Sequence, residues 1–158
     1  MEVRVRRAED RDIPRIAGLL LQVAAVHAEG RPDLFKKGSR KYSDEQLSRI
    51  LADEKTPVFV AVDDADTVLG YAFCMDATHP DDSLFTPVRT LYVDDICVDE
   101  KARGKGVGRG IYAFVRAWAK EEGYHNITLN VWSCNPTATR FYLSLGLTPY
   151  KVGMEDIL

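Results

Sequence analysis

The feature that most constrains the fold is a cluster of four glycines between Gly104 and Gly110. The residues before it, from about Val88 to Val98, read as a strand. After it, apolar residues recur at helical spacing from Val107 to Trp118, and Gly123 ends the pattern. A strand, a glycine loop and a helix in this order let the N–H groups of the first helical turn face an anion.

Two familiar phosphate-binding patterns do not fit this loop. Read from either Gly104 or Gly106, the dinucleotide pattern GxGxxG lacks its last glycine, and the Walker pattern lacks its GK[ST] ending. What remains is Arg103-x-x-Gly106-x-Gly108, whose glycines let the backbone approach a bulky anion. A tight turn whose glycines serve only packing is the alternative.

The rest of the chain shows helical and strand patterns without a repeat or a linker, so we expect a single domain over residues 1–158. Ser43 to Gln46 reads as a capped helix start, and Asn135-Pro136 as another. The expected helices cover about 12–30, 43–51, 107–123 and 135–146, and the expected strands cover 3–6, 58–62, 68–73, 88–98, 126–132 and 148–154. This order predicts an α/β (α+β) fold.

Composition narrows the class of partner. The formal net charge is only -3, so no broad basic field indicates nucleic acid or an anionic membrane. The three cysteines are odd in number and form no CxxC pair, which favours a reduced compartment, and we expect a cytoplasmic protein. The start of the chain lacks the pattern of a secretory signal, and the apolar stretch from Ile16 to Val26 is about half the length that crosses a bilayer.

Two segments match a known family by residue type and spacing. The segment from Val93 to Gly108, and Asn135-Pro136-x-Ala138-x-x-Phe141-Tyr142-x-x-Leu145-Gly146 after it, together resemble the acyl-CoA motif and a later motif of the GNAT superfamily of N-acetyltransferases. The resemblance implies a mixed, mostly antiparallel sheet of six to seven strands flanked by about four helices. It also implies that the sheet is splayed between the strand ending at Val98 and the strand ending near Trp132.

The resemblance further implies an acetyl-CoA-dependent enzyme that transfers acetyl directly to a primary amine. The pantetheine arm of acetyl-CoA would lie in the splay, paired with the backbone like an added strand, and the glycine loop would hold the pyrophosphate. The residues implied in cofactor binding are Ile96, Cys97, Val98, Arg103, Gly104, Lys105, Gly106, Val107, Gly108, Arg109 and Asn135.

Two catalytic residues follow from the same resemblance. Tyr142 corresponds to the family's general acid, which gives a proton to the departing CoA thiolate. Asp94 stands where many members carry a glutamate base, and its shorter side chain favours a water relay. Adjacent strand residues face opposite ways unless a bulge intervenes, so we expect Asp94 to face the cleft and Asp95 to be structural. Cys97 and Cys134 read as ordinary thiols.

The sequence does not identify the acceptor substrate. Acidic residues in Asp76 to Asp82 and at Asp94-Asp95 favour a small cationic amine, while a protein N-terminus or lysine, or a catalytically silent acyl-CoA-binding module, is the alternative. His79 beside Asp81 and Asp82 reads as solvated surface, so we assign no metal. The family resemblance and the prevalence of edge pairing in such folds lead us to expect a homodimer.

Overall fold

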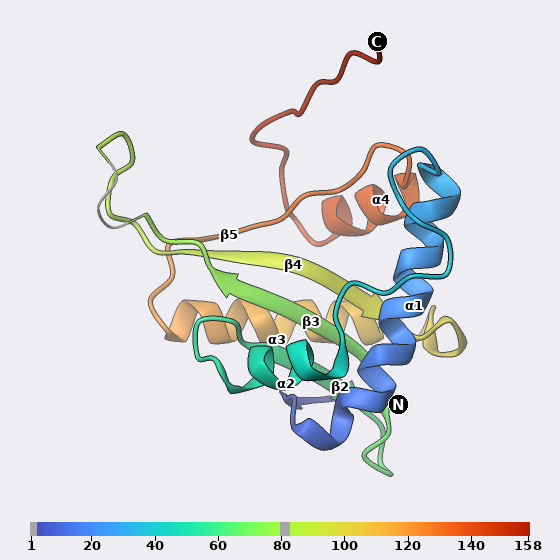
Figure 1. Ribbon diagram of the computed structural model, residues 1–158. Helices are drawn as coiled ribbons and strands as arrows, with labels where there is room; N and C mark the ends of the chain where they lie inside the picture. Colours follow the sequence, from blue (N-terminus) through green and yellow to red (C-terminus); the bar gives the residue numbers. More distant parts are fainter. Residues whose placement is uncertain (1–2, 80–82) are drawn as a thin grey trace.

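A computed structural model describes residues 3–79 and 83–158 as a five-stranded sheet with helices on both faces (Figure 1). The strands are β1 (Arg4–Arg7), β2 (Val58–Val62), β3 (Val68–Asp76), β4 (Thr90–Val98) and β5 (Asn126–Thr128), and they lie across the sheet in chain order. The first four pair antiparallel. Only β5 runs parallel to its neighbour, which requires a crossover connection. The predicted mixed, mostly antiparallel α/β fold is confirmed.

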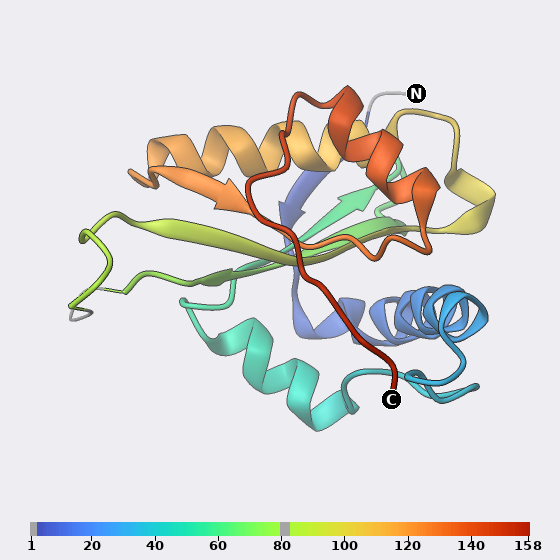
Figure 2. The same ribbon diagram turned by 90° about the horizontal axis from the view of Figure 1, so that it is seen from above.

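Four α-helices cover the sheet. They are α1 (Ile13–Gly30), α2 (Asp44–Ala52), α3 (Val107–Glu121) and α4 (Pro136–Ser144), and two short 3-10 helices, η1 (Asp10–Asp12) and η2 (Glu100–Ala102), precede α1 and α3. Figure 2 shows α1 and α2 on one side of the sheet and α3 with α4 on the other. The core accordingly has two clusters. One joins Ile16 and Leu47 to Tyr71, and the other joins Ile111 to Leu91.

Local capping explains where two of the helices begin. The Ser43 hydroxyl accepts from the Gln46 N–H at 3.2 Å, and the Gln46 side chain accepts from the Ser43 N–H at 2.8 Å. At α4 the Asn135 side chain accepts from the Ala138 N–H at 3.2 Å, and Pro136 takes the first helical position. Both caps satisfy donors that a helix end leaves without an intrahelical acceptor, and both agree with the sequence prediction.

A β-bulge divides β4 at Asp94. Phe73 of β3 pairs with Asp95, whereas the next β3 residue, Cys74, pairs with Val93, so Asp94 is an extra residue without a partner on β3. The side chains change face at this point. Leu91 and Val93 before the bulge pack on the α3 side; after it, Ile96 and Val98 pack there and Cys97 packs on the α1 side.

The predicted last strand is wrong. In the described structure the chain after Leu147 has no regular secondary structure and stands away from the sheet, although Glu155 pairs with Arg31 at 2.7 Å (Figure 1). Alternation becomes a strand only where the segment pairs with a sheet edge, and the tail makes no strand pairing with β5, the edge strand of the described sheet. The sheet therefore has five strands rather than six to seven. The alternating apolar side chains stay exposed: Tyr150 64%, Val152 77% and Met154 90%.

Among the described residues no helix combines the length and apolar character needed to cross a bilayer.

Candidate active site

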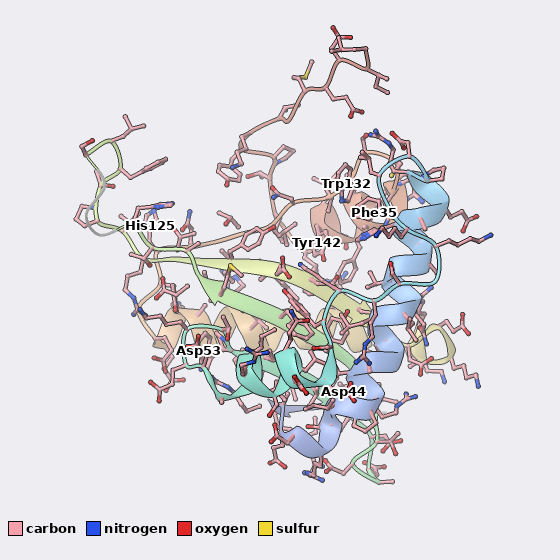
Figure 3. The ribbon with its side chains drawn as sticks, in the orientation of Figure 1. Phe35, Asp44, Asp53, His125, Trp132 and Tyr142 are labelled. Atoms are coloured by element: carbon pink, nitrogen blue, oxygen red, sulfur yellow. The ribbon has the colours of Figure 1, made fainter. Side chains whose placement is uncertain are left out.

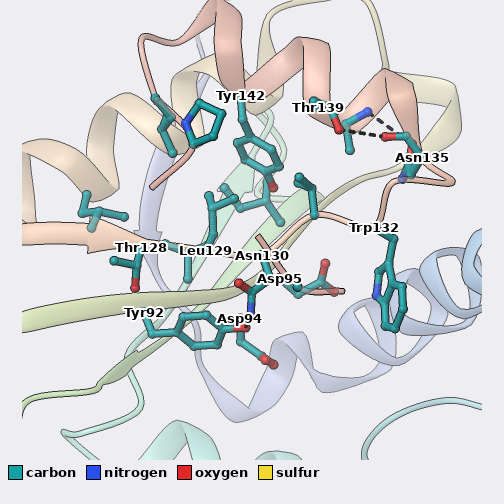
Figure 4. A pocket seen from close by; sticks show the side chains of 18 of the residues that line it. Tyr92, Asp94, Asp95, Thr128, Leu129, Asn130, Trp132, Asn135, Thr139 and Tyr142 are labelled. Carbon is teal, nitrogen blue, oxygen red and sulfur yellow. Dashed lines mark hydrogen bonds between the residues drawn. The ribbon is translucent and has the colours of Figure 1, made fainter. Parts of the chain in front are cut away.

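A large cleft opens where β4 and β5 separate. The two strands pair only from Thr90 with Asn126 to Tyr92 with Thr128, and beyond this point the described chain shows no pairing between them. The sheet is therefore splayed at the predicted place. The cleft has a volume of about 2250 Å³ and is lined by β4, the segment after β5, the end of α1, α4 and the C-terminal tail (Figure 4).

Both neighbouring carboxylates line this cleft, since the bulge meets the condition under which adjacent residues share a face. Asp95 is partly buried and accepts a hydrogen bond from the buried Tyr71 hydroxyl at 2.5 Å. Desolvation raises the pKa of Asp95 to about 6; the Tyr71 bond opposes this rise, and the nearby Asp94 charge adds to it. Asp95 therefore titrates close to neutral pH, as a catalytic base must.

Asp94 has a different environment. Its Oδ2 atom accepts from the Lys41 ammonium at 2.6 Å and from the Tyr42 hydroxyl at 3.4 Å. Its side chain is 16% exposed, whereas that of Lys41 is 54% exposed. Asp94 is thus a carboxylate already paired with a primary ammonium group inside the cleft.

Tyr142 reaches the cleft from the α3 side of the sheet, opposite to the side that Asp95 faces. It lies on α4, is partly buried and lines the same cleft, and Figure 4 shows its ring pointing toward the strand that carries Asp95. Desolvation raises the pKa of the Tyr142 hydroxyl above its usual value, and the negative charge of Asp95 adds to this effect. The hydroxyl therefore stays protonated at neutral pH and is available as a proton donor.

The glycine loop forms the predicted turn. Gly104 and Gly106 have φ of 74° and 81°, a left-handed conformation that favours glycine, and Gly106 precedes α3 as its cap. A Cβ added at either residue would meet nothing within 4 Å, so the backbone there borders open space. Arg103 folds back and donates from Nε to the Val98 carbonyl at 3.1 Å. The residues present thus fit an anion at the start of α3.

Not every predicted cofactor residue lines the main cleft. Ile96 and Asn135 do, whereas residues 103–108 lie outside its lining, at the end of β4. Arg109 donates to the Ser144 hydroxyl at 3.3 Å and lines a separate cavity of about 470 Å³. The Cys97 thiol lies on the α1 side, 3.6 Å from the Leu19 carbonyl, so only its backbone could face a ligand in the splay.

An aromatic row that the sequence did not predict lines the cleft. Phe35, from the loop after α1, packs edge-on against Trp132 with ring centres 5.3 Å apart (Figure 3). The His27 ring centre lies 4.9 Å from that of Phe35. All three line the cleft. The three residues are far apart in the sequence, so no local pattern predicts that they meet. The same holds for the contacts of Tyr71 with Asp95 and of Lys41 with Asp94. Only the pairing of β3 with β4 could have suggested Tyr71.

Within residues 3–79 and 83–158 no group of three or more His, Cys, Asp or Glu side chains is arranged to hold a metal ion. His79 stacks on Phe85, while Asp81 and Asp82, named beside it in the sequence, lie outside the described residues.

Known proteins of similar sequence and structure agree with this geometry. The model of the acetyltransferase (GNAT) family matches residues 23–147. No curated protein matches the chain. A mutant of the BH1408 protein from Bacillus halodurans is similar at 30% identity, with 98% of this chain and 99% of that chain covered and a TM-score of 0.93.

Two solved acetyltransferases share the fold at lower identity. An aminoglycoside acetyltransferase, meta-AAC0020, from an uncultured soil metagenomic sample is 18% identical, covers 99% of this chain and 96% of its own, and has a TM-score of 0.73. A ribosomal-protein-alanine N-acetyltransferase from Brucella melitensis biovar Abortus 2308 is 20% identical, covers 99% of this chain and 100% of its own, and has a TM-score of 0.74.

Proposed function

The chain belongs to the GNAT family of acetyltransferases and is an N-acetyltransferase, and from this premise we propose that it transfers acetyl directly from acetyl-CoA to a small primary amine. One observation carries the proposal. The splay between β4 and β5 opens a cleft that the Tyr142 hydroxyl reaches from one face of the sheet and the Asp95 carboxylate lines from the other. A proton donor and a proton acceptor thus border one space.

The donor side of the cleft suits acetyl-CoA. Beyond Tyr92, the edge of β4 that faces β5 has no strand partner among the described residues, so its backbone groups can pair with a pantetheine arm as with an added strand. The open backbone at Gly104 and Gly106 and the first turn of α3 can take the pyrophosphate. Arg103, Lys105 and Arg109 add positive charge nearby.

The acceptor amine must lose a proton before it attacks, because an alkylamine has a pKa of about 10.4. Of the two carboxylates, Asp95 is the better proton acceptor, since its pKa of about 6 leaves it ionised at neutral pH yet basic enough to take a proton. Asp94, the position first predicted for the base, instead suits the binding of the ammonium form by charge. A water can connect the amine to Asp95, as the short aspartate side chain favours.

Tyr142 completes the reaction as the acid. Its raised pKa keeps the hydroxyl protonated until the CoA thiolate leaves, and the thiolate then takes that proton. A covalent acyl-enzyme is not needed, because holding amine and thioester together already lowers the barrier. Burial raises the pKa of the Cys74 and Cys97 thiols to about 12 each, which makes them poor nucleophiles.

The acceptor class is the finer part of the proposal. The paired carboxylates at Asp94 and Asp95 favour a small cationic amine. A protein N-terminus or a lysine is the second candidate, because a cleft of about 2250 Å³ exceeds what a small amine fills. The two acetyltransferases of similar fold are named for acceptors of both kinds, so the fold does not choose between them.

The same proposal includes one N-acetyltransferase domain over residues 1–158, a cytoplasmic location and a homodimer. The three free cysteines support a reduced compartment. β1 stands at one edge of the sheet, with β2 as its only strand neighbour among the described residues, and an exposed edge supports pairing between two copies. Light scattering in solution tests the dimer.

The test is a panel of amines assayed for release of free CoA. Polyamines, aminoglycosides, amino acids and N-terminal peptides represent the acceptor classes. We expect turnover with at least one small amine, and Tyr142→Phe should lower kcat by about 100- to 10,000-fold, the usual contribution of a general acid. Tyr150→Phe removes the same hydroxyl from an exposed tail residue that also borders the cleft, and it should not lower kcat as Tyr142→Phe does.

Two other outcomes would contradict parts of the proposal. If Tyr142→Phe turns over as fast as the wild type, Tyr142 is not the general acid, while the proposal for acetyl-CoA binding still stands. Absence of turnover on the whole panel, together with a rise in Tm on adding acetyl-CoA, points to a silent acyl-CoA-binding module. Acetyl-CoA at about a hundred times its Kd stabilises a binding protein by about 2.7 kcal/mol, so the Tm shift is measurable.

A further inference from the structure

We propose that Lys41 occupies the amine subsite of the cleft and is itself acetylated there when acetyl-CoA is bound and no other acceptor is present. The inference rests on the proposed function, since it uses the same donor, acid and base. It concerns a modification site on this chain rather than the identity of the external acceptor.

The geometry of Lys41 is that of a bound acceptor. Its Nζ atom donates to Asp94 Oδ2 at 2.6 Å and lies 5.3 Å from the centre of the Tyr42 ring. Lys41 lines the same cleft as Asp95 and Tyr142, the proposed base and acid. A primary ammonium on a flexible aliphatic stem thus already sits on the carboxylate that we assign to acceptor binding.

The loop that carries Lys41 is fixed on both sides of it. Tyr42 stacks on Phe73 of β3 with ring centres 5.7 Å apart, and it packs against the core cluster beneath α1. The Ser43 cap begins α2 directly afterwards, and Arg40 pairs with Asp44 at 2.5 Å. The backbone is therefore anchored where the Lys41 side chain enters the cleft.

The contact is nevertheless exchangeable. The Lys41 side chain is 54% exposed, and half-exposed ion pairs hold their partners only weakly because water competes for both charges. An external ammonium can therefore displace Lys41 from Asp94. In the absence of such a competitor, Lys41 is the amine held by Asp94.

The reaction balances without a further reactant. The Lys41 ammonium gives one proton to Asp95, directly or through water, and Asp95 returns it to solvent. The Nζ lone pair then attacks the thioester carbonyl carbon, so a C–N bond forms and the C–S bond breaks. The sulfur leaves with the proton of Tyr142, and the second proton lost by Nζ restores the Tyr142 hydroxyl. The product is a neutral amide, which no longer pairs with Asp94.

The chain supplies matched internal controls. Lys36 and Lys37 lie in the same loop, are exposed, and do not line the cleft. Uncatalysed acetylation by free acetyl-CoA would reach them as readily as Lys41, because all three lysines are exposed. A preference for Lys41 therefore reports on the cleft.

The experiment incubates the full chain with acetyl-CoA alone and maps acetylated lysines by mass spectrometry after Glu-C digestion. We expect Lys41 to react more than about tenfold faster than Lys36 or Lys37, since it is positioned in the cleft. The rate per molecule should not change with protein concentration, because the reaction is intramolecular. Tyr142→Phe should slow it about 100-fold, and added cadaverine should slow it by competition for Asp94.

Equal rates at the three lysines, or a Lys41 rate that rises with protein concentration, would overturn the inference. The amine panel separates this failure from failure of the proposed function. If the wild type releases CoA with external amines and Lys41 stays unmodified, the proposed function stands and the inference fails. If neither reaction occurs, both fail.

Discussion

The raised pKa of Asp95 predicts that the ionised carboxylate needed for activity lowers the stability of the fold. One substitution tests this prediction. Its pKa is raised from an ordinary value of 3.8 to about 6, chiefly by desolvation. A group whose pKa is higher in the folded state binds its proton more tightly when folded. Its contribution to stability is therefore present at acid pH and is lost as the pH rises through about 6. At neutral pH the ionised carboxylate that the reaction needs destabilises the fold.

The magnitude follows from the two pKa values. The difference between 3.8 and about 6, at about 1.4 kcal/mol per pKa unit, gives an upper value of about 3 kcal/mol at neutral pH. About 2 kcal/mol of it develops between pH 4.5 and pH 7.5, because the unfolded-state carboxyl ionises before the folded-state one does. Asp95→Asn removes the charge and keeps an oxygen that can accept the Tyr71 hydrogen bond.

We therefore expect Asp95→Asn to be more stable than the wild type at pH 7.5 and to have lost activity. The assay is urea unfolding followed by circular dichroism at pH 4.5 and pH 7.5. The advantage of the variant should grow by about 2 kcal/mol between the two, with m unchanged. Asp156→Asn, in the exposed tail, is the control and should match the wild type at both pH values.

An advantage that stays constant or shrinks as the pH rises would refute the reasoning about Asp95. It would mean that the carboxylate is ionised without cost, and the catalytic base would then have to be sought elsewhere. A stabilised variant that keeps full activity would leave the electrostatic account intact and remove only the catalytic role.

Two further predictions concern the loop and the thiols. Gly106 has φ of 81°, so Gly106→Ala should lower the free energy of unfolding by about 1 kcal/mol and raise the KM for acetyl-CoA. Gly123, at the far end of α3, has φ of 83° and is the control. Gly123→Ala should lower the stability as much and leave that KM unchanged. Equal KM values for acetyl-CoA in the two variants would show that the loop does not bind the donor. Cys74 and Cys97 are buried with pKa values of about 12, and Cys134 is exposed. One thiol should thus react rapidly with DTNB in the native protein, and three after unfolding; three in the native protein would contradict the burial.

The parts of the fold that the sequence predicts well are those set by neighbouring residues. The Ser43 cap, the Asn135 cap and the glycine loop before α3 depend on a few consecutive residues, and each lies where the pattern predicted it. The left-handed conformation of Gly106 is seen only in the structure. Helical spacing likewise identified α1 and α3, because their apolar stripes meet the sheet.

The parts that could not be predicted depend on partners distant in the chain. The bulge at Asp94 exists only in the register between β3 and β4, and without it Asp95 reads as a residue of the opposite face. The contact of Lys41 with Asp94 spans 53 positions and follows no local pattern. The tail shows the opposite case, since alternation from Tyr150 to Met154 predicts a strand, but this segment pairs with no strand in the described structure.

The bulge also has a consequence for how such a chain can change over time. Because the side chains change face at Asp94, the segment from Thr90 to Val93 is constrained by its packing against α3 and its pairing with β5, whereas the segment from Asp95 to Val98 lies beyond the pairing with β5. A substitution within either segment leaves the facing of the other unchanged. Deletion of the single residue between them would reverse the facing of one segment relative to the other.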